Sequence, residues 1–375
     1  MNIALHFGTL RGFGSSQLGW NLFREFKKHS EHRFHVWVPE EWEEKYGTVE
    51  VQSTDRVQVI QTRPGLVQKF KTENLDIPRV IQQESIEALF SFGDTSSLVS
   101  KVPHVLLIQQ AHLTTRFKDY NYPISLKNWC RYALMKSYLK AGLKKVSQVT
   151  VQSNTMKVNF LQSHPEFENR ISVIPSTVSN IPARERREKS ANPSPKLSYV
   201  ASGAPHKNHR LLLQIMANLK AKYPGIQCIL TLNSHDLPQL YESAKKLEVL
   251  DNIDFRGPAS HEAALKIMEE SDIVLVPSKL ESFGMPYFEA MALGIPLIAS
   301  NIPIARESCG EEAYYADPDK PEAWAGIIES VLDAEENAVM RPSQNSLHYQ
   351  NVIRSWQDIA QDYLHLLENL GESRK

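Results

Sequence analysis

Two glutamates eight positions apart, Glu281 and Glu289, are the residues of this chain best placed to do chemistry. An apolar run at 272–277 precedes them and a second one at 295–299 follows. Residues 286–293 predict a short helix, because a proline suits its first turn and a glycine follows at its C-terminal cap. The order strand, loop, helix, strand is typical of a parallel sheet.

This order places both carboxylates beside one edge of the predicted sheet. Glu281 falls in the loop at the carboxyl end of the strand, where open α/β sheets bind ligands. Glu289 lies about one turn into the helix. Gly284 lies at the start of the helix, where bare backbone N–H groups can approach an anion. Carboxylates suit sugar hydroxyls and a helix N-terminus suits a diphosphate, so a nucleotide-sugar fits both, whereas an isolated glutamate pair would be two solvated surface residues.

The full string from 281 to 300, E-S-F-G-M-P-Y-F-E-A-M-A-L-G-I-P-L-I-A-S, closely resembles the glutamate–seven–glutamate motif of the retaining glycosyltransferases of family four, which belong to glycosyl transferases group 1. That family has the GT-B fold, in which two Rossmann-like α/β domains with parallel sheets face each other across a cleft. The resemblance implies that Glu281 contacts the donor sugar and Glu289 the nucleotide ribose. It also places Phe283, Gly284 and Met285 in the donor site.

A second strand–loop–helix unit at 197–219 carries a lysine, Lys207, at its turn. A cation there can neutralise a leaving diphosphate, which is a catalytic role. The family uses an arginine and a lysine together; Lys207 matches the lysine, but Ser202 stands at the arginine position. Arg210 or the neighbouring His206 could supply the second charge, or Ser202 could offer only a hydrogen bond. Arg256 opens the loop that in the family cradles the nucleotide base, and we count it as donor-binding.

In the first half of the chain, Gly12 and Gly14 stand between a strand at 2–7 and a helical pattern. They predict either an ordinary strand-to-helix turn or, by the resemblance, a loop that faces the donor phosphates and the acceptor. His112 follows the apolar run 105–108 and therefore lies near a strand's carboxyl end. A lone histidine is often structural, but the resemblance implies a catalytic histidine beside the donor sugar.

Strand-like and helical patterns alternate along the 375 residues, which predicts an α/β fold of two domains. Residues 1–178 predict a Rossmann-like acceptor domain and 197–354 a Rossmann-like donor domain. The polar, proline-bearing stretch 179–196 predicts the linker. An amphipathic helix at about 355–370 is expected to pack back on the first domain, as the resemblance implies. Within the first domain, 79–89 also predicts a helix.

Composition limits the possible partners and location. The net charge of −1 gives no reason to expect nucleic-acid binding. Three widely spaced cysteines argue against a disulfide framework and fit a reducing compartment. The N-terminus lacks a signal-peptide pattern, and no apolar run reaches the ~20 residues of a membrane span. We therefore expect a cytoplasmic protein.

Two further stretches bear on partners. Asp317-Pro-Asp319 matches the metal-binding D-x-D of the other large glycosyltransferase fold, but Asp319 suits the start of a helix near Pro321, so we expect no metal and no cofactor. Residues 127–146 combine lysines and arginine with aromatic and aliphatic residues in a helical pattern. This pattern predicts peripheral contact with an anionic membrane, contact with an acidic acceptor, or a helix on the sheet with solvated lysines.

Together these features predict a retaining hexosyltransferase that uses a UDP- or GDP-sugar and a glycan or lipid-linked acceptor, in cell-surface polysaccharide or glycolipid synthesis. A sugar-nucleotide epimerase with the same architecture is one alternative. A non-catalytic scaffold subunit is another, supported by Ser202 and opposed by the intact glutamate pair.

Overall fold

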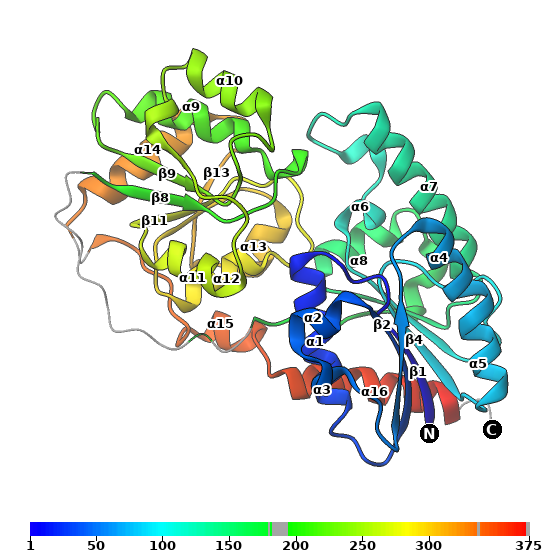
Figure 1. Cartoon of the computed structure of the whole chain (residues 1–375). Helices are drawn as coiled ribbons and strands as arrows, with labels where there is room; N and C mark the ends of the chain where they lie inside the picture. The colour runs from blue at the N-terminus through cyan, green and yellow to red at the C-terminus, as the bar shows by residue number, and fades with distance from the viewer. Residues whose placement is uncertain (179–180, 182–193, 336–337, 373–375) are drawn as a thin grey trace. The chain divides into compact units, whose positions relative to one another are not determined.

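The computed structural model describes residues 1–178, 181, 194–335 and 338–372 (Figure 1). The chain divides into two compact units. The first comprises 1–119, 125–176 and the chain from Arg354 onward, and the second comprises 120–124 and 177–353. The predicted linker falls largely on residues outside the described ranges.

In the described part of the chain, the first unit is built on a sheet of seven parallel strands in the order β3-β2-β1-β4-β5-β6-β7. The strands are β1 Asn2–His6, β2 Arg33–Pro39, β3 Val57–Thr62, β4 Ala88–Phe92, β5 His104–Ile108, β6 Gln148–Val151 and β7 Ile171–Val173. The helices are α1 Phe13–Phe26, α2 Glu41–Tyr46, α3 Thr48–Val51, α4 Leu66–Lys71, the π-helical η1 Thr72–Asp76, α5 Ile77–Gln83, α6 Ala111–Thr114, η2 Phe117–Asp119, α7 Leu126–Leu143, α8 Asn154–Leu161, η3 Pro165–Arg170 and α16 Trp356–Glu372.

Neighbouring residues of β4 show how this sheet is covered on both faces. Successive side chains of a strand point to opposite faces. Leu89 clusters with Ile77 and Ile81 of α5, whereas the Phe90 ring stacks on Tyr363 of α16, with 4.6 Å between the ring centroids. The C-terminal helix α16 therefore belongs to the core of the first unit, alongside the N-terminal part of the chain.

The predicted helix over 79–89 is wrong at its C-terminal end. Helix α5 ends at Gln83, and Ala88 already begins β4. Between them Ser85 has a φ of 50°, which turns the chain out of the helix. The apolar residues after this turn belong to the loop and the strand, although their spacing continues the helical period.

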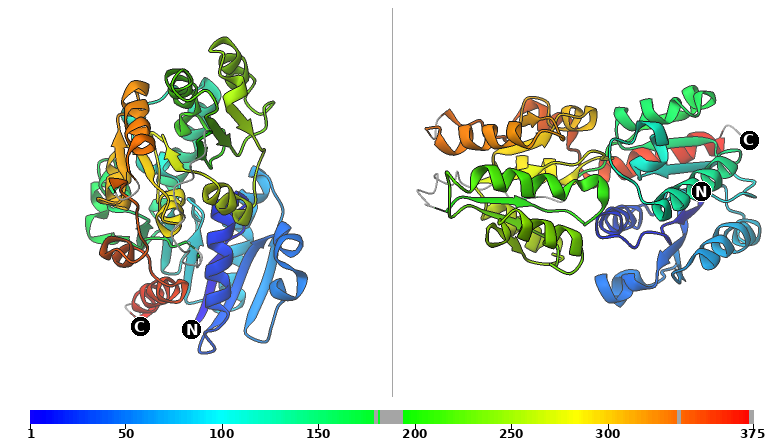
Figure 2. Two further views of the ribbon diagram at one scale, coloured as in Figure 1. Left: turned by 90° about the vertical axis from the view of Figure 1, so that its left-hand side faces the viewer. Right: turned by 90° about the horizontal axis from the view of Figure 1, so that it is seen from above.

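In the described part of the chain, the second unit contains a sheet of six parallel strands in the order β10-β9-β8-β11-β12-β13. Helices α9 and α14 lie on one of its faces and α11 and α12 on the other (Figures 1 and 2). The strands are β8 Lys196–Tyr199, β9 Gln227–Leu230, β10 Ile253–Phe255, β11 Ile273–Val276, β12 Leu297–Ser300 and β13 Tyr314–Ala316. The helices are η4 Pro205–Lys207, α9 His209–Leu219, α10 Pro238–Lys246, η5 Leu250–Asn252, α11 His261–Glu269, α12 Met285–Ala292, α13 Pro303–Cys309, α14 Pro321–Asp333 and α15 Leu347–Val352.

Among the residues that the structure describes, no helix combines the length and the apolar character needed to cross a membrane.

Candidate active site

The site is built around the start of α12, which begins at Met285, one residue before the predicted helix. Gly284 caps it in the left-handed region, with φ of 77° and ψ of 58°. A Cβ at Gly284 would come within 2.4 Å of the Tyr287 ring. Glycine is therefore required twice, by its backbone angle and by the packing, and it leaves bare backbone at the N-terminus of the helix.

Lys207 and Glu281 meet at this edge although 74 positions separate them. Lys207 ends η4, in the loop after β8, and Glu281 lies in the loop after the neighbouring strand β11. The Lys207 Nζ donates a hydrogen bond of 2.6 Å to Glu281 Oε1, and the side chains are only 17% and 8% exposed. The parallel pairing of β8 and β11 brings their carboxyl ends, and so these two loops, together.

Glu289 is held by a histidine that the sequence analysis did not single out. Its side chain is buried, and its Oε1 accepts a hydrogen bond of 2.9 Å from His261 Nε2. His261 is the first residue of α11, directly after the capping residue Ser260, whose Oγ accepts from the backbone N–H of Ala263. The hydrogen bond and the negative charge of Glu289 raise the pKa of His261, against the effect of burial.

Buried polar contacts fix the two loops from below. The hydroxyls of Tyr199 in β8 and Ser278 after β11 lie 2.8 Å apart, and the backbone N–H of Lys279 donates to the carbonyl of His206 at 2.8 Å. Burial, and then the charge of Glu281, raise the pKa of Tyr199 far above its ordinary value. The Tyr199 hydroxyl therefore stays neutral and serves as a structural hydrogen-bonding group.

The remaining donor-binding predictions fall into two groups. Met285 is half-buried in the first turn of α12, and Ser202 is exposed in the loop after β8. Phe283 is buried and its ring stacks on Phe288, with 4.5 Å between centroids. It therefore supports α12 from the core, and its role at the donor stays a prediction, as do the roles of the other two.

The two arginines have partners of their own outside the Lys207–Glu281 pair. Arg210 donates to Gln239 Oε1 at 3.1 Å. Arg256 donates to Asp254 at 2.8 Å and to Glu270 at 3.0 Å, and these hydrogen bonds raise the pKa of Arg256. Neither hydrogen bond joins an arginine to the Lys207–Glu281 pair, and their roles at the donor stay predictions.

The prediction that Asp319 caps a helix is wrong. Helix α14 begins at Pro321 with Lys320 as its N-cap, and no side chain caps it. The Asp319 carboxylate instead pairs with Lys279, which lies two residues before Glu281 and was also not singled out by the sequence analysis. Among the described residues, no group of three or more histidines, cysteines or acidic residues could hold a metal ion.

The candidates from the first half of the chain lie in the first unit. His112 is buried in α6, and its ring stacks on Tyr132 of α7 with 4.4 Å between centroids. The Asp94 carboxylate fixes the loop before it, because Oδ1 accepts from the backbone N–H groups of Gln109 and Gln110 at 2.6 and 2.8 Å. His112 thus lies on a rigid turn that follows β5.

The glycine loop is an ordinary turn in its local geometry. Gly12 is the N-cap of α1 with φ of −71°, and Gly14 lies in the first turn. Neither glycine has a positive φ. Whether this loop and His112 join the donor site stays a prediction.

The geometry of the second unit defines what the site can do. Lys207, Glu281 and the bare N-terminus of α12 lie at the carboxyl edge of a parallel sheet, and the buried Glu289 follows about one turn into the helix. The two cationic groups can stabilise a diphosphate and the carboxylates can accept hydroxyl hydrogen bonds. The class that this fold and site define is that of the glycosyltransferases with the GT-B fold.

Comparisons with known proteins agree. Residues 181–348 match the family described as glycosyl transferases group 1. The match covers 168 of the 375 residues, and over this part the chain is similar to the group 1 glycosyltransferases. The chain is 27% identical over 253 residues to the O-antigen chain mannosyltransferase RfbU of Salmonella typhimurium, covering 66% of this chain and 68% of RfbU. It is also 29% identical over 178 residues to the D-inositol 3-phosphate glycosyltransferase of Rhodococcus erythropolis, covering 45% of this chain and 40% of that protein.

Solved structures share the fold over almost the whole chain. HepE from Anabaena, crystallised with UDP and glucose, aligns with a TM-score of 0.70 at 16% identity, covering 98% of this chain and all of HepE. A glycosyltransferase from Rickettsia africae aligns with a TM-score of 0.70 at 18% identity, covering 98% of both chains. The α/β GT-B fold predicted from the sequence is thereby confirmed.

Proposed function

We propose that this protein transfers a hexose-type sugar from a UDP- or GDP-sugar to a glycan or lipid-linked acceptor, with retention of configuration. The observation that carries the proposal is the Lys207–Glu281 pair in adjacent loops after β8 and β11, with Glu281 three residues before the glycine that caps α12. In this proposal Lys207 and the backbone at Gly284 hold the diphosphate. Glu281 holds the donor sugar and Glu289 the ribose.

The difficult step is departure of the sugar as an oxocarbenium-like species while negative charge grows on the diphosphate. Lys207 and the N-terminus of α12 are positive groups already fixed where that charge develops, so they need no reorganisation during the reaction. In the proposed mechanism these groups stabilise the leaving group without a metal or another cofactor. Glu281 orients the sugar, and His112 contacts it from the acceptor domain.

The relatives suggest the pathway. RfbU is by name an O-antigen chain mannosyltransferase, and we propose a related role for this chain in cell-surface polysaccharide or glycolipid synthesis, at the cytoplasmic face of the membrane. Helix α7 supports peripheral binding to anionic lipid. It exposes Leu126, Trp129 and Leu134, which are 77%, 46% and 66% exposed, and the same helix carries the exposed Lys127 and Arg131.

One predicted member of this basic surface does not belong to it. Lys136 is half-buried and donates to the carbonyl of Thr115. Burial lowers the pKa of Lys136 to about 8. The proposed membrane-facing charge therefore comes from the other basic residues of α7 and its C-terminal end.

A nucleotide screen tests the donor site directly. UDP, GDP and ADP, and their sugars, are added to the full chain at increasing concentration while thermal unfolding is followed. A nucleotide held at 100 times its dissociation constant should stabilise by about 2.7 kcal/mol. Lys207→Met should weaken this effect, whereas Lys220→Met, on a half-buried lysine just after α9, should not. If none of the nucleotides stabilises the protein, the proposed function is wrong.

Product analysis separates transfer from the alternative reactions. A transferase releases the nucleoside diphosphate and needs an acceptor, whereas an epimerase changes the sugar with no acceptor. A scaffold subunit does neither. The buried Lys207–Glu281 pair favours catalysis over a scaffold role, because a buried ion pair carries a desolvation cost that a scaffold does not require.

A further inference from the structure

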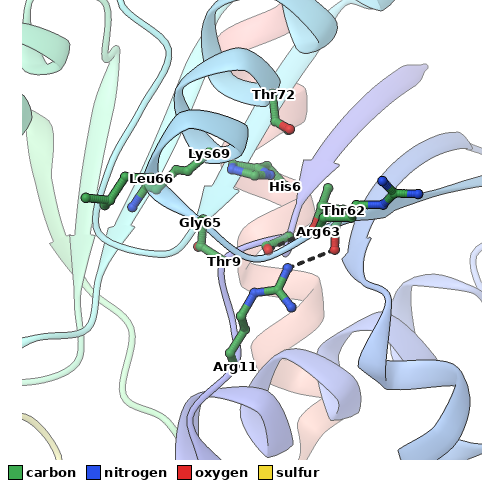
Figure 3. Close-up of a pocket in the computed structure, with 10 residues that line it drawn as sticks. His6, Thr9, Arg11, Thr62, Arg63, Gly65, Leu66, Lys69 and Thr72 are labelled. Carbon is green, nitrogen blue, oxygen red and sulfur yellow. Dashed lines mark hydrogen bonds between the residues drawn. The ribbon is translucent and has the colours of Figure 1, made fainter.

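A pocket outside the donor unit lies in the first unit, at the carboxyl ends of β1 and β3 (Figure 3). Its volume is about 270 Å³. Three elements contribute: the end of β1 with the loop that follows it, the end of β3, and helix α4 with the first residue of η1. The lining residues used below are His6, Arg11, Thr62, Leu66 and Lys69.

The charged groups in this lining are cationic. None of the described residues that line it is an aspartate or a glutamate. Arg11 donates through Nη2 to the Thr62 carbonyl at 2.8 Å (Figure 3) and pairs through Nη1 with Glu41. A guanidinium has five N–H donors, so Arg11 keeps donors beyond these two contacts. Its side chain is 26% exposed, which leaves it accessible from the pocket.

Lys69 enters the lining from helix α4, with its side chain 24% exposed. Its Nζ lies 4.0 Å from the buried carboxylate of Glu73, which is beyond hydrogen-bond distance. That carboxylate is already satisfied, because it accepts from Thr95 Oγ1 at 2.6 Å and from the Tyr138 hydroxyl at 2.7 Å. Glu73 thus balances the lysine charge from behind, and the ammonium keeps its donors for a ligand.

His6 adds a polar group inside the pocket. Its side chain is 2% exposed, and Nε2 lies 3.5 Å from Glu73 Oε1. Its other ring nitrogen, Nδ1, is buried and has no hydrogen-bond partner in the part of the chain that the structure describes. A buried, unsatisfied ring nitrogen costs free energy unless a ligand or water supplies the partner. With Nε2–H directed at Glu73, Nδ1 is an acceptor that suits a water or the hydroxyl of a protonated phosphate, while the Arg11 guanidinium and the Lys69 side chain offer the donors.

An apolar surface continues from the pocket along α4. Leu66 lines the pocket and is itself 79% exposed, and Val67 and Phe70 on the same helix are 75% and 51% exposed. Leu66 and Phe70, at positions i and i+4, lie on the same face of α4, and Val67 borders that face. A ligand seated in the pocket thus has an adjoining apolar surface for a hydrocarbon or sugar-ring extension.

We propose that this pocket binds an oxyanion carried by the acceptor, a phosphate or a carboxylate, through Arg11 and Lys69. That the ligand is the acceptor rests on the proposed function. That the ligand is an oxyanion rests on the pocket alone. It gives the first unit a specific role as the site for the acceptor's charged group, separate from the diphosphate site at Lys207.

Inorganic phosphate is the first probe. Isothermal titration calorimetry of the full chain, with UDP present at saturation so that the donor site is filled, measures phosphate binding at constant ionic strength. A lost charge-assisted hydrogen bond is worth roughly 1.5–3 kcal/mol, so Arg11→Gln and Lys69→Gln should each weaken binding about tenfold or more. Arg33→Gln is the matched control, because Arg33 begins β2 at the opposite edge of the sheet, and it should stay within about twofold of the parental protein.

A second pair of probes identifies the source of the oxyanion. Farnesyl phosphate carries an apolar chain and glucose 6-phosphate carries a sugar ring. Whichever binds more tightly than inorganic phosphate identifies a lipid-linked or a water-soluble acceptor, provided that Lys69→Gln weakens it. Thermal unfolding checks that both variants remain folded, and because they lie on different elements, a folding defect in one leaves the other as the test.

Three results would overturn the inference. The parental protein could fail to bind phosphate, both variants could bind phosphate as tightly as the parental protein, or neither organic phosphate could bind more tightly than inorganic phosphate. These results are distinct from failure of the proposed function, which would appear as an absence of UDP binding.

Discussion

The Lys207–Glu281 pair predicts that stability and catalysis can be separated by a double substitution. Both side chains are almost buried, so removal of one partner strands the other charge in a poorly solvated place. We consider Lys207→Met, Glu281→Gln and the double variant. Methionine keeps the length of the lysine stem, and glutamine keeps the shape of the glutamate.

The magnitudes follow from the burial. Breaking a fully buried pair costs about 3–5 kcal/mol, and the 17% exposure of Lys207 allows partial hydration. Lys207→Met, which strands Glu281, should therefore destabilise the second unit by about 2–4 kcal/mol. Glu281→Gln keeps an oxygen acceptor for the ammonium and should cost about 1–2 kcal/mol. The double variant buries no unpaired charge and should return to within about 1 kcal/mol of the parental protein.

The assay must report on the second unit alone. Of the six tryptophans, Trp324 is buried in that unit and the other five lie in the first. The ¹⁹F resonance of 5-fluorotryptophan at this position therefore follows its unfolding in urea. Transfer activity should be lost in all three variants, while stability is lost mainly in the single ones. A double variant no more stable than Lys207→Met would refute the reasoning, because the two charges would then not depend on each other.

Three other perturbations follow from the same geometry. The pKa of His261 is raised in the folded state, so its pairing with Glu289 contributes stability that is fully present below the ordinary pKa of 6.5 and is lost as the pH rises through the raised pKa. His261→Gln should flatten this pH dependence of the unfolding free energy in urea titrations. An unchanged curve would contradict the pairing with Glu289. Gly284→Ala should destabilise the second unit by about 2–4 kcal/mol, from the left-handed angle and the contact with Tyr287, and a loss below about 1 kcal/mol would contradict this. Asp94→Ala should speed hydrogen exchange of the two backbone amides that its carboxylate accepts by about tenfold or more, and parental exchange rates would show that other contacts hold that loop.

Local signals were sufficient for elements whose ends are chemically marked. The helix predicted at 286–293 is found at Met285–Ala292, because its proline and its flanking glycine fix both ends independently of the rest of the fold. The apolar run at 105–108 is found in strand β5, His104–Ile108. The helix predicted over 79–89 failed because a single residue, Ser85, leaves helical backbone while the apolar spacing continues.

Partners distant in sequence were not predictable in the same way. Glu281 could be recognised from its own motif, but its pairing with Lys207 depends on β8 and β11 being neighbours, which no local pattern specifies. The only local feature of His261 is that it follows Ser260, a residue suited to cap a helix. That feature does not indicate a hydrogen bond to Glu289, which was therefore not predicted. Asp319 was predicted to cap a helix because a helix does follow it, but its carboxylate forms an ion pair with Lys279 from another loop.

The same non-local pairing determines how the donor site should respond to ligand. In the proposed function, a diphosphate that binds Lys207 replaces the Glu281 carboxylate as the anion beside the ammonium group. The ammonium charge is therefore compensated both before and after binding. In the proposed function, that exchange frees Oε1 of Glu281 for a hydroxyl group, while the Tyr199–Ser278 contact keeps the two loops in position. Under the proposed function, binding of the diphosphate and release of the Glu281 carboxylate would therefore be one event. A sugar without a diphosphate meets Glu281 still engaged, which favours the nucleotide-sugar over a free sugar.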